Sequence, residues 1–130
     1  MRLRIFKTKA FARFARSQRI SDAGLSEAIR RAEAGSIDAD LGGGVIKQRV
    51  ARPGRGRSGG FRVLIAYRVA TLSVFLFGFA KSERDNIDDD ELATLREIAK
   101  GWFAADTRAI QRAVGDGLLQ EVDYGEKEKA

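Results

Sequence analysis

Residues 72–80, LSVFLFGFA, are apolar on both of the faces that a strand presents. Such a strand is stable only when both faces of its sheet are covered, because either face would otherwise expose large hydrophobic side chains to water. No segment approaches the roughly 18 apolar residues of a membrane-spanning helix. The run therefore predicts a central strand in a sheet that is packed on both sides.

Two stretches ahead of this run are predicted to be strands of the same sheet. Residues 2–6 fit a short strand, and residues 45–51 alternate in character. Since side chains alternate between the two faces of a strand, Lys47 and Arg49 fall on one face of the second stretch.

Residues 61–68 are predicted to form the next strand, with Arg62 and Arg68 on one face. Tyr67 falls on the opposite face, where we expect it to point into the core. Between the two basic strands, residues 52–60 hold one proline and four glycines. This composition predicts a turn without regular structure.

Helical spacing marks the remaining segments. Thr8 suits the N-cap of a helix over residues 9–18, and a second helix is expected to open at Ser21 and to end at Gly35. The segment that follows, residues 36–41, is predicted to be a connector. A third is expected to begin at the acidic residues from Asp88 onward, which favour the positive end of a helix. Its predicted buried stripe consists of Leu92, Leu95, Ile98, Ala99, Trp102 and Phe103.

The last part of the chain is expected to add a helical piece over residues 107–114, a short strand over residues 118–122 and a frayed charged tail. The order of elements predicts an α+β fold. We expect a small antiparallel-rich sheet with two N-terminal helices packed on it and a C-terminal helix.

The composition narrows the chemistry. The chain has 130 residues, which suits one domain, and it contains no cysteine and no histidine. Disulfides, zinc sites built from cysteine or histidine, and catalysis by imidazole are thereby excluded. The N-terminus lacks the apolar run of a signal peptide, so we expect a cytoplasmic protein with no membrane contact.

The distribution of charge points to a polyanionic partner. Residues 1–81 carry 17 basic and 5 acidic side chains, whereas residues 82–130 carry 7 basic and 13 acidic ones. Residues 41–81 hold eight Lys and Arg and no Asp or Glu. A block of this kind favours nucleic acid, through counterion release and electrostatic steering. The alternative is a basic protein whose charges are simply solvated.

The basic block could support cleavage of RNA. Lys47 and Arg49 lie two residues apart on one strand face, or about 7 Å, which approximates the spacing of phosphates along a single strand. A crowded lysine can act as a base, whereas arginine keeps its proton and can only stabilise charge. If the protein cleaves RNA, Lys47 could act as the base, and Arg49, Arg62 and Arg68 could at best stabilise charge. A plain surface strand face would also explain Arg62 and Arg68.

Further cations are available at both ends of the block. The glycine-rich turn adds Arg52, Arg55 and Arg57, which can fork hydrogen bonds to phosphate. The turn lacks the GK[ST] ending of a nucleotide-binding loop. Lys81 follows the last strand, where it could serve the site or form a salt bridge with the residues after it.

Four segments carry a resemblance to a known family: IFKTKAFARFAR, ISDAGLSEAI, IDADLGGGVIKQRVARPGRGRSGGFRVLIAYR and FLFGFAKSERDNI. Together they resemble the RelE/HigB-like toxins of bacterial type II toxin–antitoxin modules. The resemblance covers about residues 1–103, so residues 104–130 are expected to be a C-terminal extension. It implies a compact sheet with two N-terminal helices, and an endoribonuclease that cuts mRNA on the translating ribosome without a metal or other cofactor. It also implies a cognate antitoxin protein as partner.

The resemblance assigns roles to four residues. Arg62 corresponds to the arginine of the family's "YR" strand, Lys47 and Arg49 match a basic pair on the preceding strand, and Lys81 matches the basic residue after the last strand. Lys47 is expected to be the base, and the other three are expected to stabilise the phosphorane. Arg52, Arg55, Arg57 and Arg68 are expected to bind the RNA backbone.

The chain departs from the family pattern at one point. Several relatives carry a tyrosine or a histidine shortly after the last strand, whereas this chain reads SERDNIDDD there. The general acid is therefore unassigned, although Lys81 could serve. Two alternatives follow: a non-catalytic poison of DNA gyrase of the related ParE type, and an inactive module that binds RNA or an antitoxin.

Overall fold

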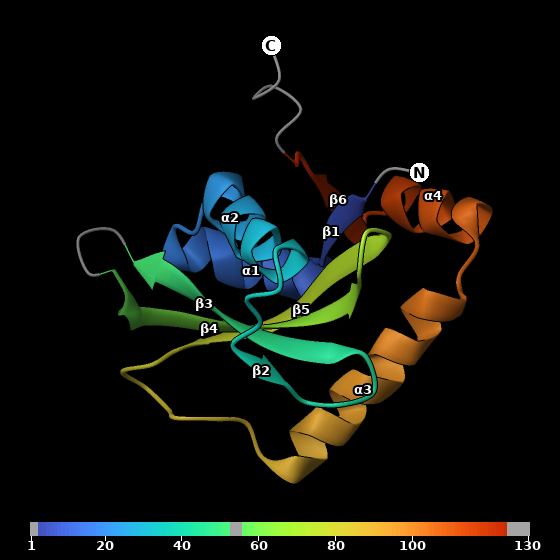
Figure 1. Ribbon diagram of the computed structural model, residues 1–130. Helices are drawn as coiled ribbons and strands as arrows, with labels where there is room; N and C mark the ends of the chain where they lie inside the picture. Colours follow the sequence, from blue (N-terminus) through green and yellow to red (C-terminus); the bar gives the residue numbers. More distant parts are fainter. Residues whose placement is uncertain (1–2, 53–55, 125–130) are drawn as a thin grey trace.

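The structure is a computed structural model, and it describes residues 3–52 and 56–124, without the side chains of residues 56–58. The described residues form a six-stranded sheet and four helices, which confirms the predicted α+β class (Figure 1). The strands are β1 (Arg4–Thr8), β2 (Ala39–Asp40), β3 (Val45–Arg52), β4 (Gly56–Arg68), β5 (Leu72–Ala80) and β6 (Leu119–Val122). The helices are α1 (Lys9–Gln18), α2 (Asp22–Glu33), α3 (Asp89–Ala104) and α4 (Thr107–Gly115).

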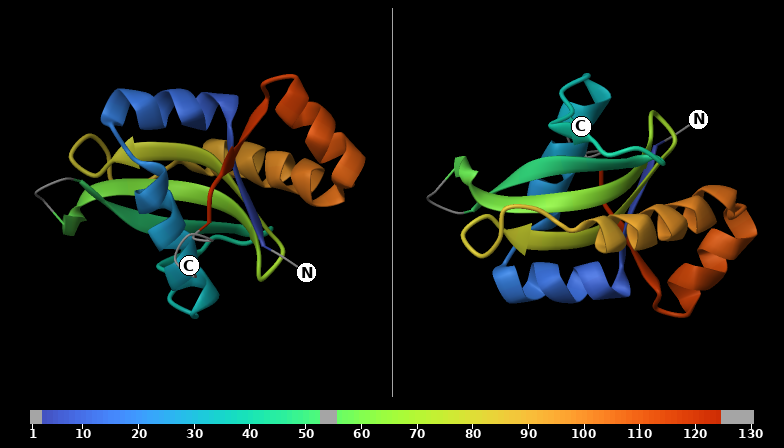
Figure 2. Two further views of the ribbon diagram at one scale, coloured as in Figure 1. Left: turned by 90° about the horizontal axis from the view of Figure 1, so that it is seen from above. Right: turned by 90° about the horizontal axis from the view of Figure 1, so that it is seen from below.

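The strand order is β2-β3-β4-β5-β1-β6. The strands from β2 to β5 pair antiparallel in sequence order, whereas β1 pairs parallel with β5 and antiparallel with β6. The first and the last strand of the described chain thus lie side by side at one edge of the sheet (Figure 2).

Both faces of the sheet are covered, as the apolar run of β5 predicts. Helices α1 and α2 pack on one face, around a core that includes Ile5, Phe61 and Phe75. Helices α3 and α4 contribute to a second core, which includes Val74 and Leu76. We call the side of the sheet that carries this second core the α3 face.

A β-bulge in β5 redirects two aromatic side chains. Leu64 pairs with Phe77 and Ile65 with Phe75, so Leu76 is an extra residue in β5. A bulge of this kind changes the face on which the following residues point. Phe77 and the later Phe79 consequently pack with the core of the α3 face.

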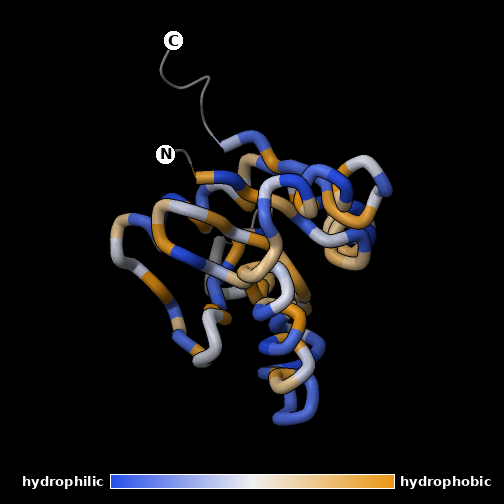
Figure 3. Tube along the Cα trace, turned by 90° about the vertical axis from the view of Figure 1, so that its right-hand side faces the viewer, coloured by the Kyte–Doolittle hydropathy of each residue, from blue (hydrophilic) through white to orange (hydrophobic). Residues whose placement is uncertain are grey.

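The predicted helix starts are confirmed by their caps. Thr8 Oγ1 accepts a hydrogen bond from the Phe11 N–H at 3.1 Å, and Ser21 caps α2 in the same way. Asp88 and Glu91 form a capping box at the start of α3, where each side chain accepts a hydrogen bond from the backbone N–H of the other residue. Hydrophobic and hydrophilic residues are interleaved along these helices, as an amphipathic helix requires (Figure 3).

Three local predictions are wrong or incomplete. The predicted irregular turn over residues 52–60 is wrong for Arg52, which belongs to β3, and for residues 56–60, which belong to β4, whereas residues 53–55 lie outside the described residues. Ile98, which helical spacing places in the buried stripe of α3, is 42% exposed, since α3 faces the sheet with Leu95 and Ala99. The segment ahead of β3, predicted to be a connector, contains the two-residue strand β2.

The C-terminal elements form as predicted, with α4 followed by the strand β6. Ile110 and Ala113 of α4 and Leu119 of β6 are buried in the core of the α3 face. Among the described residues, no helix has the length and apolar character needed to cross a membrane.

Candidate functional site

Two arginines face each other on neighbouring strands of the sheet. Arg49 of β3 and Arg62 of β4 are direct cross-strand partners, and both alternate onto the α3 face. Direct partners in an antiparallel pair have Cα atoms about 5 Å apart, which brings the two side chains together. We call Arg49 and Arg62 the cationic pair. Sequence parity predicted the face, and the register of the strands places the two arginines directly opposite each other, with the Arg49 guanidinium directed to Asp38 on the β2 side of β3.

The environment of Arg62 opposes its positive charge. Burial is the largest effect that lowers the pKa of Arg62, and the positive charge of Arg49 lowers this pKa further. The carboxylate of Asp38 acts in the opposite direction. Two like charges held together favour an anion, because a phosphate beside them would relieve their repulsion. Such an arrangement is typical of a site that binds or stabilises a phosphate group.

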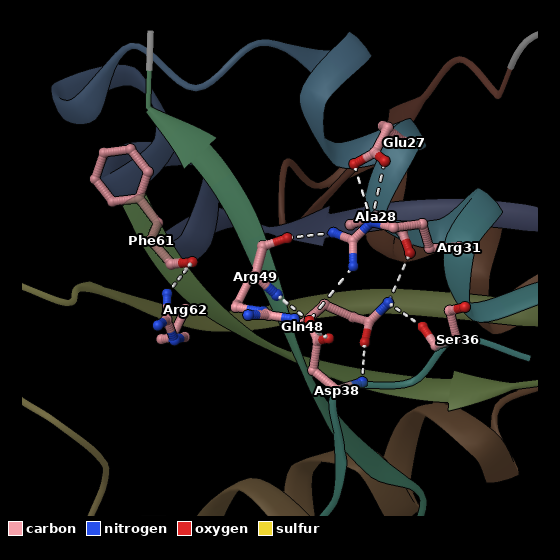
Figure 4. Close-up of polar contacts among 9 residues, drawn as sticks. All are labelled: Glu27, Ala28, Arg31, Ser36, Asp38, Gln48, Arg49, Phe61 and Arg62. Atoms are coloured by element: carbon pink, nitrogen blue, oxygen red, sulfur yellow. Dashed lines mark hydrogen bonds and ion pairs between the residues drawn. The ribbon is translucent and has the colours of Figure 1, made fainter. Parts of the chain in front are cut away.

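The Asp38 carboxylate binds both the backbone and the side chain of Arg49 (Figure 4). The carboxylate accepts a hydrogen bond from the Arg49 N–H at 2.7 Å and one from its Nη2 at 3.1 Å. Arg31 of α2 donates to the same carboxylate at 3.4 Å and also to the Arg49 carbonyl. The carboxylate side chain of Asp38 is only 18% exposed, so these contacts are partly shielded from water.

Gln48 fixes the segment that carries Asp38. Its side chain is fully buried, and its Oε1 accepts a hydrogen bond from the Asp38 N–H at 2.7 Å. Its Nε2 donates to the carbonyl groups of Ala28 at 2.9 Å and Ser36 at 3.2 Å (Figure 4). These hydrogen bonds tie helix α2 to strand β3. Breaking any of them would leave a buried polar group without a partner, which is costly.

Lys47 lies on the same face as the cationic pair, two residues before Arg49. Its Nζ lies 3.4 Å from the Asn86 Oδ1, which also accepts a hydrogen bond from the Ile87 N–H at 3.0 Å. Segment 81–88 leaves β5 at the end of the sheet where β3 turns into β4 (Figure 2). The segment therefore brings its polar groups toward Lys47 without burying the lysine completely.

Lys81 begins this segment. Its backbone N–H donates to the Gly60 carbonyl at 3.0 Å, which fixes its main chain to the start of β4. Its Nζ lies 3.7 Å from the Asp85 Oδ1, and both side chains are exposed. An exposed ion pair at this distance contributes little stability, so the ammonium group is available to a ligand.

Arg84, which no sequence pattern singles out, also lies at this end of the sheet. Its guanidinium lies over the ring of Phe79, which is the cross-strand partner of Arg62. It also binds the Glu91 carboxylate at 2.6 and 3.2 Å. Pairs of opposite charge seven residues apart across a loop carry no sequence signal, and only the fold reveals the contact.

Two of the other predicted RNA-binding arginines, Arg52 and Arg68, lie away from the cationic pair. Arg52 lies over the ring of Phe61, whose side chain belongs to the core under α1 and α2. Arg55 lies outside the described residues, as does the side chain of Arg57.

Arg68 shares the face of Arg62 but lies at the far end of β4 from it. Its guanidinium stacks on Phe103 at 4.6 Å from the ring centre. It lines an open groove of about 490 Å³ together with Gly43, Arg96, Glu97, Lys100, Phe103 and Ala104. Six residues separate Arg68 from Arg62, or about 20 Å along the strand.

Tyr67 points away from the cationic pair, as its parity predicts. It packs against the core under α1 and α2, and its hydroxyl donates to the carboxylate of Glu33. Burial, followed by this hydrogen bond and the charge of Glu33, raises the pKa of Tyr67 well above its ordinary value. Tyr67 is thus not placed to donate a proton on the α3 face.

The pKa of Asp38 gives a pH-dependent test of its contacts. Burial opposes ionisation of this carboxylate, but the two hydrogen bonds from Arg49 and the charges of Arg49 and Arg31 outweigh burial and lower its pKa. A carboxylate with a lowered pKa stabilises the fold only while it is ionised. We expect Asp38→Asn to reduce the free energy of unfolding at neutral pH. The loss should shrink as the pH falls below about 3.9, the ordinary aspartate value, and through the lowered pKa of the folded protein.

Urea unfolding of the wild type and of Asp38→Asn, measured in parallel from neutral to acidic pH, checks this expectation. A difference in stability that stays constant down to the lowest pH would contradict it. Such a result would mean that the amide introduced by the substitution disturbs packing and that the charge of Asp38 contributes nothing.

Within the described part of the chain, no three potential metal-binding side chains come together. The site is thus a cluster of organic cations: the cationic pair with Lys47 beside it, and Lys81 and Arg84 on the segment that follows β5. A cluster of this kind can bind a phosphate and stabilise extra negative charge on it.

Comparison with known proteins identifies the family. A family model described as the RelE toxin of the RelE/RelB toxin–antitoxin system matches residues 3–122. No curated protein and no solved structure matches the chain. The match spans all the described strands and helices, from β1 to β6. The chain belongs to the RelE toxin family and is a toxin of a toxin–antitoxin system, in which an antitoxin is its partner.

Proposed function

We propose that this toxin is an endoribonuclease that cuts mRNA on the ribosome and so inhibits translation. The observation that carries the proposal is the juxtaposition of Arg49 and Arg62 across β3 and β4, with Lys47 on the same face. Membership of a toxin family supports it, since the RelE family is generally associated with endoribonucleases. The acid-free block of residues 41–81 supplies the positive surface that an RNA substrate requires.

The reaction needs a base, a stabiliser of negative charge and an acid. In the proposed mechanism, Lys47 takes the proton from the 2′-hydroxyl of the nucleotide before the cleaved bond. The 2′-oxygen then forms a bond to phosphorus while the bond from phosphorus to the 5′-oxygen breaks. The products are a 2′,3′-cyclic phosphate and a 5′-hydroxyl.

The cationic pair stabilises the phosphorane through which this reaction passes. Extra negative charge develops on the non-bridging oxygens as the 2′-oxygen attacks, and the guanidinium groups of Arg49 and Arg62 can each donate hydrogen bonds to them. Lys81 adds positive charge at the same end of the sheet. Its ammonium group is also our candidate for the acid that protonates the leaving 5′-oxygen.

Lys47→Ala provides the test of the proposed reaction. We expect the wild type to stop growth on expression and to cut mRNA in purified ribosome–mRNA complexes. Loss of a general base typically costs at least about 100-fold in rate, and we expect that loss for Lys47→Ala. Lys9→Ala is the matched control, because Lys9 is an exposed lysine at the start of α1, on the opposite side of the sheet.

The competing functions give different results in the same experiment. If the wild type stops growth while mRNA stays intact and DNA supercoiling is inhibited, the protein is a gyrase poison and the proposal fails. If expression is harmless and purified protein only binds RNA or the antitoxin, the protein is an inactive binding module. A cut that persists unchanged in Lys47→Ala would reject Lys47 as the base while leaving the nuclease itself in place.

A further inference from the structure

Strand β2 is short, and side chains take over where its backbone pairing ends. Its two residues pair as Ala39 with Lys47 and Asp40 with Ile46. Continued in the same register, the next pair would be Asp38 with Gln48. In its place, the Asp38 N–H donates to the side chain of Gln48, and the Asp38 carboxylate accepts the N–H of Arg49. The carboxylate thus substitutes for a strand residue at this edge of β3.

The same carboxylate also restrains the side chain of Arg49. One oxygen binds the backbone N–H at 2.7 Å and the other binds Nη2 at 3.1 Å. An arginine anchored at both its main chain and its guanidinium has lost most of the rotamer freedom that a surface arginine keeps. Without the carboxylate, a 46% exposed side chain would be free to adopt other rotamers.

The anchor itself is held from helix α2. Arg31 binds the Glu27 carboxylate at 3.0 and 3.2 Å, the Asp38 carboxylate at 3.4 Å and the Arg49 carbonyl (Figure 4). A chain of alternating charges therefore runs from Glu27 through Arg31 and Asp38 to Arg49. It connects a helix on one face of the sheet to a cation on the other, around the edge that β2 leaves open.

We propose that Asp38 is a positioning residue, which holds the Arg49 guanidinium in one orientation on the β2 side of β3, so that Arg49 and Arg62 can bind the phosphate at the site of cleavage from two sides. The inference rests on the proposed nuclease function and adds to it a residue that touches no substrate. It also explains why an acid is placed at the edge of a face that otherwise attracts RNA. The negative charge of Asp38 weakens the attraction of this face for RNA, but the same carboxylate fixes the orientation of the Arg49 guanidinium.

This role has a consequence that a purely structural role does not share. Asp38→Asn removes a negative charge close to the RNA, so RNA binding should stay the same or become tighter. The rate of the bound complex should fall, because Arg49 is no longer aimed at the phosphate. Partial unfolding would instead lower the amount of active protein, without tighter binding by the fraction that remains folded.

The experiment measures cleavage of ribosome-bound mRNA by the full chain under single-turnover conditions. We expect Asp38→Asn to lower the cleavage rate about tenfold at saturating toxin, with KM unchanged or lower. Asp40→Asn is the matched control, because it removes the same charge from the neighbouring exposed position of β2. It should retain the wild-type rate.

A double-mutant cycle shows whether Asp38 acts through Arg49. In an Arg49→Ala background, Asp38→Asn should cause no further loss of rate, since the side chain that it positions is gone. Equal losses in both backgrounds would overturn the inference, and so would a rate for Asp38→Asn within twofold of the wild type.

A readout without activity separates this inference from the proposed function. If the wild type leaves ribosome-bound mRNA intact, the nuclease function fails, and the order of the Arg49 side chain still tests the positioning. NMR relaxation of the Arg49 Nε–H should report a rigid group in the wild type and in Asp40→Asn, and a mobile one in Asp38→Asn. An equally rigid Arg49 in all three proteins would reject the role of Asp38 whatever the enzyme does.

Discussion

Arg62→Ala is expected to lower the rate of mRNA cleavage about 10²- to 10³-fold and to leave the protein at least as stable as the wild type. The loss of rate follows from removing a preorganised donor that stabilises charge in the transition state. Stability is expected to be kept because burial and the charge of Arg49 both work against the positive charge of Arg62 in the folded protein. Removing that charge relieves the repulsion across the β3–β4 pair.

The two halves of this expectation are measured separately. Single-turnover cleavage of ribosome-bound mRNA gives the rate, and urea unfolding gives the free energy of unfolding. Arg108→Ala is the matched control, since Arg108 is an exposed arginine of α4 and its removal changes the net charge equally. Activity of Arg62→Ala within tenfold of the wild type would remove Arg62 from the catalytic group. A strong loss of stability would mean that Arg62 is structural.

Gly44→Ala is expected to destabilise the fold by about 2–5 kcal/mol. Gly44 has φ +82°, which is costly for any residue with a Cβ, by about 1–2 kcal/mol. A Cβ added there would also lie 2.4 Å from the Cε2 of Phe103, a residue of α3 that packs against the core of the α3 face. Overpacking of this kind typically costs a further 1–3 kcal/mol or so. The measurement is urea or thermal unfolding of the variant.

Gly117→Ala isolates the packing part of this cost. Gly117 has φ +79°, but a Cβ added there meets nothing within 4 Å. Its substitution should therefore cost only the backbone strain, about 1–2 kcal/mol. If Gly44→Ala and Gly117→Ala are equally destabilising, the close approach of Phe103 to the start of β3 has no energetic weight.

The sequence predicted on which face of its strand a side chain lies better than it predicted where in the sheet that side chain lies. Alternation alone assigned Lys47, Arg49, Arg62 and Arg68 to faces of their strands, and the apolar run of residues 72–80 predicted a sheet covered on both sides. Parity cannot tell where along a strand a residue lies relative to a neighbouring strand. It therefore grouped Arg62 with Arg68, although β4 carries the second arginine to the groove beside Phe103. The register that makes Arg49 the partner of Arg62 depends on the whole β3–β4 hairpin.

Contacts between a side chain and a distant backbone were beyond the reach of periodicity. Asp38 stands in a segment predicted to be a connector, and its contact with Arg49 arises only because β2 ends after two residues. The prediction of an irregular turn was wrong for Arg52 and residues 56–60, because glycine is a strong turn signal and the pairing of β3 with β4, in which Arg52 is the partner of Gly56, overrides it. Ile98 shows the same limit. Helical spacing predicts which side of α3 faces the sheet, but it does not predict how many residues around the helix are buried, and Ile98 is exposed.

The position of β1 between β5 and β6 governs how the chain can fold as it is made. The antiparallel meander of β3, β4 and β5 needs only neighbouring segments, whereas β1 must wait for Leu72, the partner of Arg4, and then for Val122, the partner of Ile5. Closing such long loops costs chain entropy before any contact repays it, so folding is expected to be slower than for a simple meander. The sheet of a newly synthesised toxin is therefore incomplete until the chain has emerged as far as Val122.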